Sequence, residues 1–151
     1  MNILLLKVPK IKMKKFLVII LIHFAIFLPM GVFPEDVEEY VLSESPYGLT
    51  FDGTNFWYID TKRRALYKID EIGRQEVFNL NIAKLTGVTF DPREGKIFVA
   101  SSRLILKVEP NTGGVTDRIH VPIDKIGGIA SVGGALYILN SENGKIAIYP
   151  T

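Results

Sequence analysis

The sequence contains no cysteine and only two histidines, of which His23 lies in an apolar run near the N-terminus. Without cysteine there is no disulfide framework, thiolate metal site or thiol nucleophile. With His120 as the one histidine outside the apolar run, a Ser-His-Asp or Cys-His catalyst is not expected. There is no P-loop and no Rossmann glycine pattern, since the Gly-Gly pairs at 113–114, 127–128 and 133–134 fit turns and strand starts.

Acidic residues are absent before Glu35, so the formal charge of +2 hides an uneven distribution. Five of the 18 basic residues precede the apolar run, which leaves 13 basic against 16 acidic residues in the rest of the chain. That balance lacks the strongly basic character of nucleic-acid-binding domains. No nucleic-acid partner is therefore expected.

Residues 1–33 have the pattern of a targeting segment. Lys14 and Lys15 precede residues 16–33, which carry no charge. A basic stretch followed by an apolar stretch is typical of a secretory signal peptide, and 18 residues also reach the lower limit for a membrane span. Two alternatives stay open, a cleaved signal or a retained anchor, and the start codon is either Met1 or Met13. In both cases residues 34–151 are predicted to be extracytoplasmic, periplasmic or secreted, with membrane contact only through residues 16–33.

A repeat of about 40 residues organises the rest of the chain. Gly48-Leu49-Thr50-Phe51-Asp52 aligns with residues 87–91, 39 positions later, and with residues 128–131 after a further 41. Second strands are predicted at 56–60, 97–101 and 136–140, and third strands at 66–70, 105–109 and 145–149. Regularly spaced short strands with Gly and Asp in the turns predict an all-β fold made of β-propeller blades.

Outer strands complete the predicted blades at 76–80 and 116–121, and residues 37–42 stand in the same relation to the first blade. With strands A to D counted outward, the order is D-ABCD-ABCD-ABC, about three four-stranded blades with offset ends. The predicted repeats are 48–86, 87–127 and 128–151. Because propellers use about four to eight blades, two alternatives stay open. The chain is part of a longer ring, or it is a homodimer completing a six-bladed ring.

The stretch PYGLTFDGTNFWYID with RRALYKID (residues 46–60 and 63–70) resembles the blades of six-bladed TolB-like, NHL-type and YVTN-type propellers. The resemblance covers Tyr40 to Tyr149 and describes an architecture, so it is weakly specific for function. Glu44-Ser45-Pro46, together with the aromatic second strand and Arg63-Arg64, is also similar to the opening blade of the SMP-30/gluconolactonase family. That similarity implies a metal-dependent lactonase or hydrolase, a divalent cation such as calcium, and Glu44 and Asn140 as ligands.

Loops that join strand D to A and strand B to C lie on one face of a propeller, where ligands commonly bind. The ligand-binding candidates on this face are Tyr47, Asp60, Arg63, Arg64, Ser101, Arg103 and Asn140. The oxygens of Asp60, Ser101 and Asn140 would hold a cation or polyol, or bond the backbone of their own turns. The arginines would bind a carboxylate or phosphate, or pair with loop acids.

These observations favour an exported propeller module that binds an unidentified ligand or protein, with no catalytic residues and no cofactor. The alternative is the metal-dependent lactonase or hydrolase that the SMP-30 resemblance implies, present here as one part of a larger ring.

Overall fold

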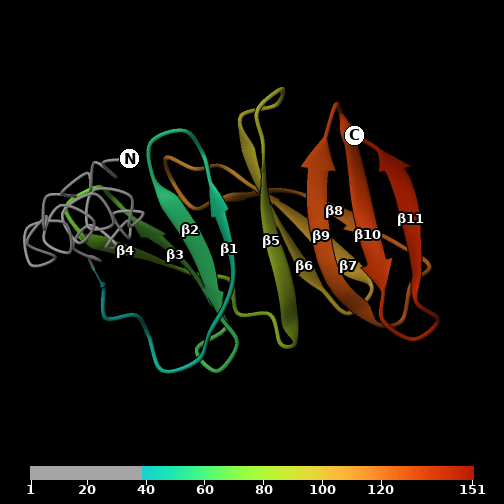
Figure 1. Cartoon of the computed structure of the whole chain (residues 1–151), viewed down its shortest axis with the longest axis horizontal. Helices are drawn as coiled ribbons and strands as arrows, with labels where there is room; N and C mark the ends of the chain where they lie inside the picture. Colours follow the sequence, from blue (N-terminus) through green and yellow to red (C-terminus); the bar gives the residue numbers. More distant parts are fainter. Residues whose placement is uncertain (1–38) are drawn as a thin grey trace, which may run out of the picture. The chain divides into compact units, whose positions relative to one another are not determined.

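A computed structural model describes residues 39–151, which form three antiparallel sheets of short strands joined by turns (Figure 1). The first sheet consists of β1 (Pro46–Phe51), β2 (Phe56–Asp60), β3 (Ala65–Ile69) and β4 (Gln75–Asn79). The second consists of β5 (Leu85–Asp91), β6 (Lys96–Ser101), β7 (Leu104–Val108) and β8 (Val115–His120). The third consists of β9 (Ile126–Val132), β10 (Ala135–Asn140) and β11 (Lys145–Pro150). None of these residues forms a helix long and apolar enough to cross a bilayer.

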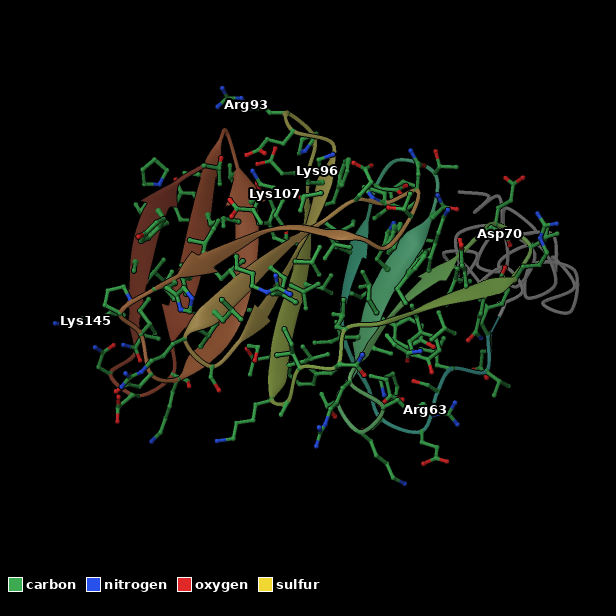
Figure 2. All side chains as sticks on the ribbon, turned by 180° about the vertical axis from the view of Figure 1, so that it is seen from behind. Arg63, Asp70, Arg93, Lys96, Lys107 and Lys145 are labelled. Carbon is green, nitrogen blue, oxygen red and sulfur yellow. The ribbon has the colours of Figure 1, made fainter. Side chains whose placement is uncertain are left out.

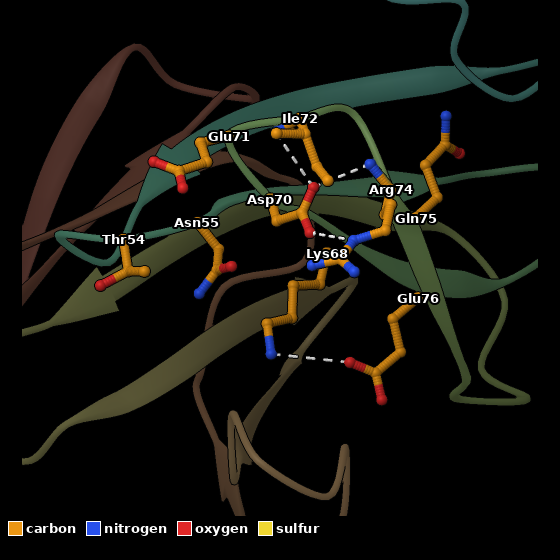
Figure 3. A pocket seen from close by; sticks show the side chains of 9 residues that line it. All are labelled: Thr54, Asn55, Lys68, Asp70, Glu71, Ile72, Arg74, Gln75 and Glu76. Carbon is orange, nitrogen blue, oxygen red and sulfur yellow. Dashed lines mark hydrogen bonds and ion pairs between the residues drawn. The ribbon is translucent and has the colours of Figure 1, made fainter.

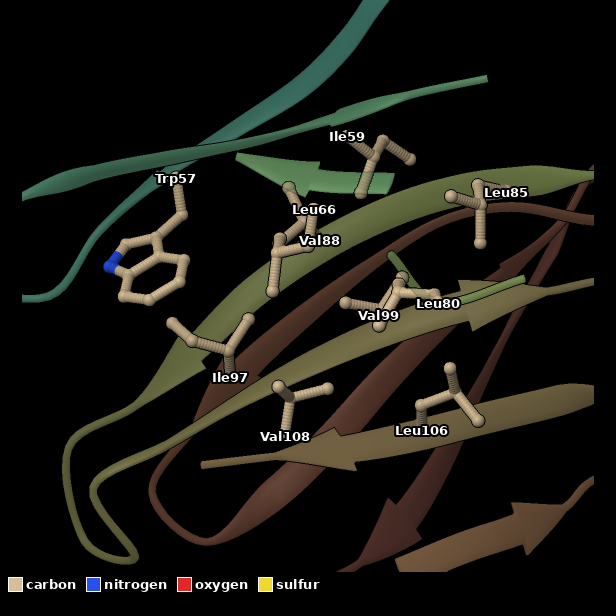
Figure 4. Close-up of a cluster of buried hydrophobic side chains, with 10 residues drawn as sticks. All are labelled: Trp57, Ile59, Leu66, Leu80, Leu85, Val88, Ile97, Val99, Leu106 and Val108. Atoms are coloured by element: carbon tan, nitrogen blue, oxygen red, sulfur yellow. The ribbon is translucent and has the colours of Figure 1, made fainter. Parts of the chain in front are cut away.

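The sheets pack face to face because each middle strand is apolar on both sides. Trp57, Ile59 and Leu66 of the first sheet meet an apolar face of the second sheet (Figure 4). That face consists of Leu85, Val88, Ile97, Val99, Leu106 and Val108. Fully burying one such aliphatic side chain contributes about 2 kcal/mol. Burial on both faces explains why β6 reads as an apolar run rather than an alternating one.

The second and third sheets are joined in the same way. Phe98, Ala100 and Ile105 pack against Leu136 and Ile138. The inner strands β1, β5 and β9 also lie close to one another. At Gly87 of β5 the approach is so close that a Cβ would lie only 3.2 Å from the backbone nitrogen of Ile129 in β9. The hydroxyl oxygens of Thr50 and Thr89 accept hydrogen bonds from backbone N–H groups of the next inner strand, both at 3.1 Å.

The predicted all-β propeller fold and its repeat are confirmed, and the predicted strand positions agree with the observed ones to within about two residues at either end. The outer strand predicted at 37–42 differs. Residues 39–42 form no strand, and 37–38 lie outside the described residues. A propeller outer strand pairs with the third strand of its own blade, and the described chain contains no blade in front of β1 for this segment to join. The predictions for residues 1–33 and 34–38 also lie outside the described residues.

Candidate ligand-binding site

The predicted site residues lie at one end of the sheets. Pro46 is opposite Asp60, Leu85 is opposite Ser101, and Ile126 is opposite Asn140, so the start of each inner strand meets the end of its neighbour. We call loops 43–47, 60–64, 80–86, 101–103, 121–127 and 140–145 the mouth loops. We call loops 52–55, 70–74, 91–96, 109–114 and 133–134 the far loops. In Figure 2, Arg63 and Lys145 mark the end with the mouth loops, and Arg93 lies at the opposite end.

The side chains of Asp60, Ser101 and Asn140 form hydrogen bonds with the backbone of nearby loops. Asp60 is buried, and its Oδ1 accepts hydrogen bonds from the N–H groups of Lys62 and Arg63 at 2.8 and 2.7 Å. Burial raises the pKa of Asp60, but hydrogen bonds, including these two, outweigh it and hold the pKa below its usual value. Ser101 donates to the carbonyl of Ala83, and Asn140 Oδ1 accepts from the N–H of Glu142. Asp60 and Asn140 therefore bond the backbone of their own turns, as one of the two interpretations predicts, whereas Ser101 bonds the preceding D–A loop instead.

Two predicted arginines pair with loop acids. Glu44 accepts a hydrogen bond from Lys62 Nζ at 2.5 Å and lies 3.9 Å from Arg63. Arg103 pairs with Asp124, which raises the pKa of this arginine through a hydrogen bond and its negative charge. Each pair joins two mouth loops: loop 43–47 to loop 60–64 in the first case, and loop 101–103 to loop 121–127 in the second. These exposed pairs are weak, because water and salt screen them.

Arg64 differs from the other predicted arginines. It is exposed and forms no ion pair within residues 39–151, and its carbonyl accepts a hydrogen bond from the N–H of Leu80. Its φ of 56° is left-handed, which is uncommon for a residue with a side chain. The equivalent position in the turn of the third blade is Gly144, with φ 67°. Tyr47, the last candidate, is 51% exposed at the start of β1.

Sequence reasoning missed two exposed lysines and three left-handed residues of the mouth loops. Lys84 and Lys145 are exposed and have no ion pair in the described part of the chain. The backbone of Lys84 is left-handed with φ 57°, and so are those of Asn81 and Ser102. Every left-handed residue of the far loops is a glycine. The alignment of Arg64 with Gly144 indicates the left-handed turn at Arg64, but the repeat gives no such signal for Asn81, Lys84 or Ser102.

The divalent cation implied by the SMP-30 resemblance does not fit the residues present. Glu44 is exposed and faces two cationic side chains. Asn140 Oδ1 is already an acceptor for its own turn. Asp60 Oδ2 is buried without a hydrogen-bond partner, yet residues 39–151 contain no group of three acidic or histidine side chains able to hold a metal. No chemistry through a metal follows from this arrangement.

A separate hollow of about 550 Å³ lies at the far loops of the first blade (Figure 3). Four of its five charged groups form two ion pairs: Arg74 Nε lies 2.6 Å from Asp70, and Lys68 Nζ lies 3.5 Å from Glu76, whereas Glu71 is in no ion pair within the described residues. The sequence did not indicate this hollow, because its walls come from two loops and the adjoining parts of β3 and β4, which only the fold brings together. Its one charge outside an ion pair is negative, so it offers less to an anionic ligand than the mouth loops do.

Comparisons with known proteins show the fold and no more. No family model matches the chain, and no curated protein does. Virginiamycin B lyase from Staphylococcus aureus superposes with a TM-score of 0.57 at 19% identity, covering 77% of this chain and 45% of the lyase. Regucalcin from Agrobacterium tumefaciens, described as a calcium-binding protein, gives a TM-score of 0.56 at 20% identity, with 70% of this chain and 45% of regucalcin covered. The WD40 β-propeller domain of Doa1 gives 0.54 at 13% identity, with 80% and 38% covered.

The chain thus has the blade structure of β-propellers and spans less than half the length of these solved structures. Similarity at this level of identity carries the architecture to this chain and not the chemistry of any of the proteins compared.

Proposed function

We propose that the chain is an exported, non-catalytic binding module whose mouth loops hold an anionic ligand, a carboxylate or a phosphate. The basic residues of the mouth loops are Lys62, Arg63, Arg64, Lys84, Arg103, Lys125 and Lys145. The exposed acids there are Glu44, Asp124 and Glu142, and all three are in ion pairs. Positive charge is therefore in surplus at this end, although the exported part as a whole is slightly acidic.

The observation that carries the proposal is the backbone of Arg64 and Lys84. Both cations are exposed, lack an ion pair within the described residues, and have φ near +56°. A left-handed conformation costs a residue with a side chain roughly 1–2 kcal/mol. Strain of this kind concentrates at ligand-binding positions, where the surrounding structure holds it. A glycine would relieve it, as Gly144 does in the third blade.

Titration of the full chain with inorganic phosphate and with citrate, followed by calorimetry and by thermal unfolding, tests the proposal. We expect binding that weakens as salt rises, because the contacts are charge-assisted and partly exposed. The double variant Arg64→Gln/Lys84→Gln should lose at least about tenfold in affinity, the equivalent of two charge-assisted contacts at an exposed site.

Arg118→Gln is the matched control, because Arg118 is exposed on the outer strand β8 and carries the same charge away from the mouth loops. It should leave phosphate affinity unchanged. Equal losses in Arg118→Gln and in the double variant would show unspecific charge attraction and overturn the proposal. Stoichiometric binding of calcium or zinc that is lost in Glu44→Gln or Asn140→Ala would favour the metal-dependent hydrolase instead.

A further inference from the structure

The third sheet leaves an apolar face uncovered. In the first two sheets this face packs against the next sheet, so that Leu66 and Ile105 are 0% exposed. The equivalent residue of the third sheet is Ile146, because β10 pairs with β11 in the register in which β2 pairs with β3. Ile146 is 64% exposed, and Val132, Leu139 and Ile148 are exposed beside it. Contiguous apolar surface of this kind marks an interaction site.

The opposite face of the first sheet is exposed along β1 and the start of β2, whereas Tyr58, Tyr67 and Ile69 on the same face are buried. Leu49, Phe51 and Phe56 are exposed there, with the two phenylalanine rings 4.9 Å apart. The residues that correspond to Leu49 and Phe56 in the second sheet are Val88 and Ile97, which are buried against the first sheet. Within the chain, the same kind of interface forms between the first and second sheets and between the second and third sheets. The two outermost sheets each expose one side of such an interface.

The third sheet also has an open edge. Its order is β11-β10-β9, so β11 lacks the outer strand that β4 supplies to β3 and β8 supplies to β7. Those outer segments have apolar residues at alternate positions, Phe78 and Leu80 in one and Ile119 and Val121 in the other. Residues 39–42 have the same alternation in Tyr40 and Leu42, yet they form no strand, and Val41 is 90% exposed.

Residues 39–42 cannot reach β11 of their own chain. Residues 43–45 alone join them to β1, and three extended residues span about 10 Å. The entire second sheet stands between the first and the third, and packed sheets are about 10 Å apart, so the third lies about 20 Å away (Figure 1). In each complete blade the outer strand leads directly into the inner strand of the next blade. Residues 39–42 therefore belong to a blade packed on the open face of the first sheet.

We propose that this blade is the third sheet of a second copy. Each copy adds residues 39–42 to β11 of its partner as the missing outer strand, and the open face of the third sheet packs on the open face of the partner's first sheet. The arrangement is two-fold symmetric, so the contact forms twice and closes a ring of six blades. A six-bladed ring lies within the usual range of about four to eight blades, and every blade in it has four strands. This inference does not depend on the anion site.

The absence of cysteine from the sequence makes a cross-linking test clean. By the register of Val77 opposite Tyr67 and of Arg118 opposite Leu106, Glu39 should lie opposite Ala147 of the partner. Full-length chains carrying Glu39→Cys and Ala147→Cys are co-expressed with different tags and mildly oxidised. We expect a disulfide-linked pair that contains both tags, and no link when either variant is expressed alone.

Co-expression of Asn111→Cys with Ala147→Cys is the matched control, because Asn111 is exposed in a far loop of the second blade, outside the proposed contact. It should give no specific link. Equal linking in the control, or an intramolecular disulfide in a chain carrying both Glu39→Cys and Ala147→Cys, would overturn the proposal.

Sedimentation of the unmodified full chain in mild detergent gives a second readout. We expect two copies per particle and one copy for Ile146→Lys, whose circular dichroism spectrum should stay native because Ile146 is exposed in the single chain. Thr116→Lys, on the exposed outer strand β8, should still form the dimer. A monomeric wild-type chain, a series of larger open assemblies, or a single copy bound to a different protein would each overturn the proposal.

Discussion

The two ends of the strands are built differently, although the same three blades supply both. At the far loops, Asp52 and Asp91 use both carboxylate oxygens, and every left-handed residue is a glycine. At the mouth loops, Asp60 uses one oxygen for its turn, and arginine, lysine, serine and asparagine occupy left-handed positions. The far loops are thus close to their most stable form, whereas the mouth loops retain strain and surplus charge. Regions that bind ligands are commonly of the second kind.

Asp91→Ala should have the largest effect on stability, because the far-loop carboxylate joins two sheets. Its Oδ1 accepts from the N–H groups of Arg93 and Glu94, and its Oδ2 accepts from the hydroxyl of Ser131 in β9 at 2.9 Å. Loss of these charge-assisted bonds in a buried place should cost about 3 kcal/mol. Asp60→Ala at the mouth loops should cost less. Chemical denaturation measures both, and a larger loss for Asp60→Ala would contradict the comparison.

Acid should weaken the fold through the same carboxylates. Burial raises the pKa of Asp91, but the bonds from Ser131, Arg93 and Glu94 outweigh it and hold the pKa below its ordinary value. A pKa lowered by folding gives stability that is present above about pH 4 and is lost as the pH falls through the folded value. The free energy of unfolding should therefore be level from pH 7 to 5 and fall below pH 4.

Asp91→Asn tests the source of this pH dependence, since asparagine keeps one acceptor and cannot titrate. Its unfolding free energy should fall less steeply between pH 4 and pH 3 than that of the wild type. An unchanged slope would show that other carboxylates dominate the acid response.

Arg64→Gly should stabilise the chain by about 1 kcal/mol, because glycine adopts the left-handed conformation without the Cβ penalty. The matched change at a far loop is Gly95→Arg. Gly95 has φ 62° and no heavy atom near its absent Cβ, so this variant should lose about 1 kcal/mol through backbone strain alone. Unfolding is measured without added anions. Arg64→Gly should also weaken phosphate binding. If the variant is more stable but binds phosphate normally, the strain at Arg64 is unrelated to anion binding.

Much of this organisation followed from the sequence, and the rest depended on contacts between segments far apart in it. The short apolar strands and their repeat of about 40 residues located the strands in the sequence, because each blade buries the same positions. The turn role of Asp60 and Asn140 was predicted as one alternative, since such residues commonly bond their own turns. The pairing of Glu44 with Lys62 joins segments that only the fold brings together. The strand expected at 37–42 failed for residues 39–42 because pairing depends on a neighbour that the repeat cannot supply.

Of these variants, Glu44→Gln should change the free energy of unfolding least, and it should strengthen phosphate binding. Its carboxylate pairs with Lys62 and Arg63 on the surface, and exposed ion pairs contribute about 0–1 kcal/mol. Removing the negative charge releases two cations at the mouth loops, so phosphate should bind more tightly than in the wild type. Glu71→Gln removes an equally exposed charge from a far loop and should leave phosphate affinity unchanged. If Glu44→Gln instead weakened phosphate binding, the pair itself would be what positions Arg63, and the mouth loops would resemble the far loops in being held by their own charges.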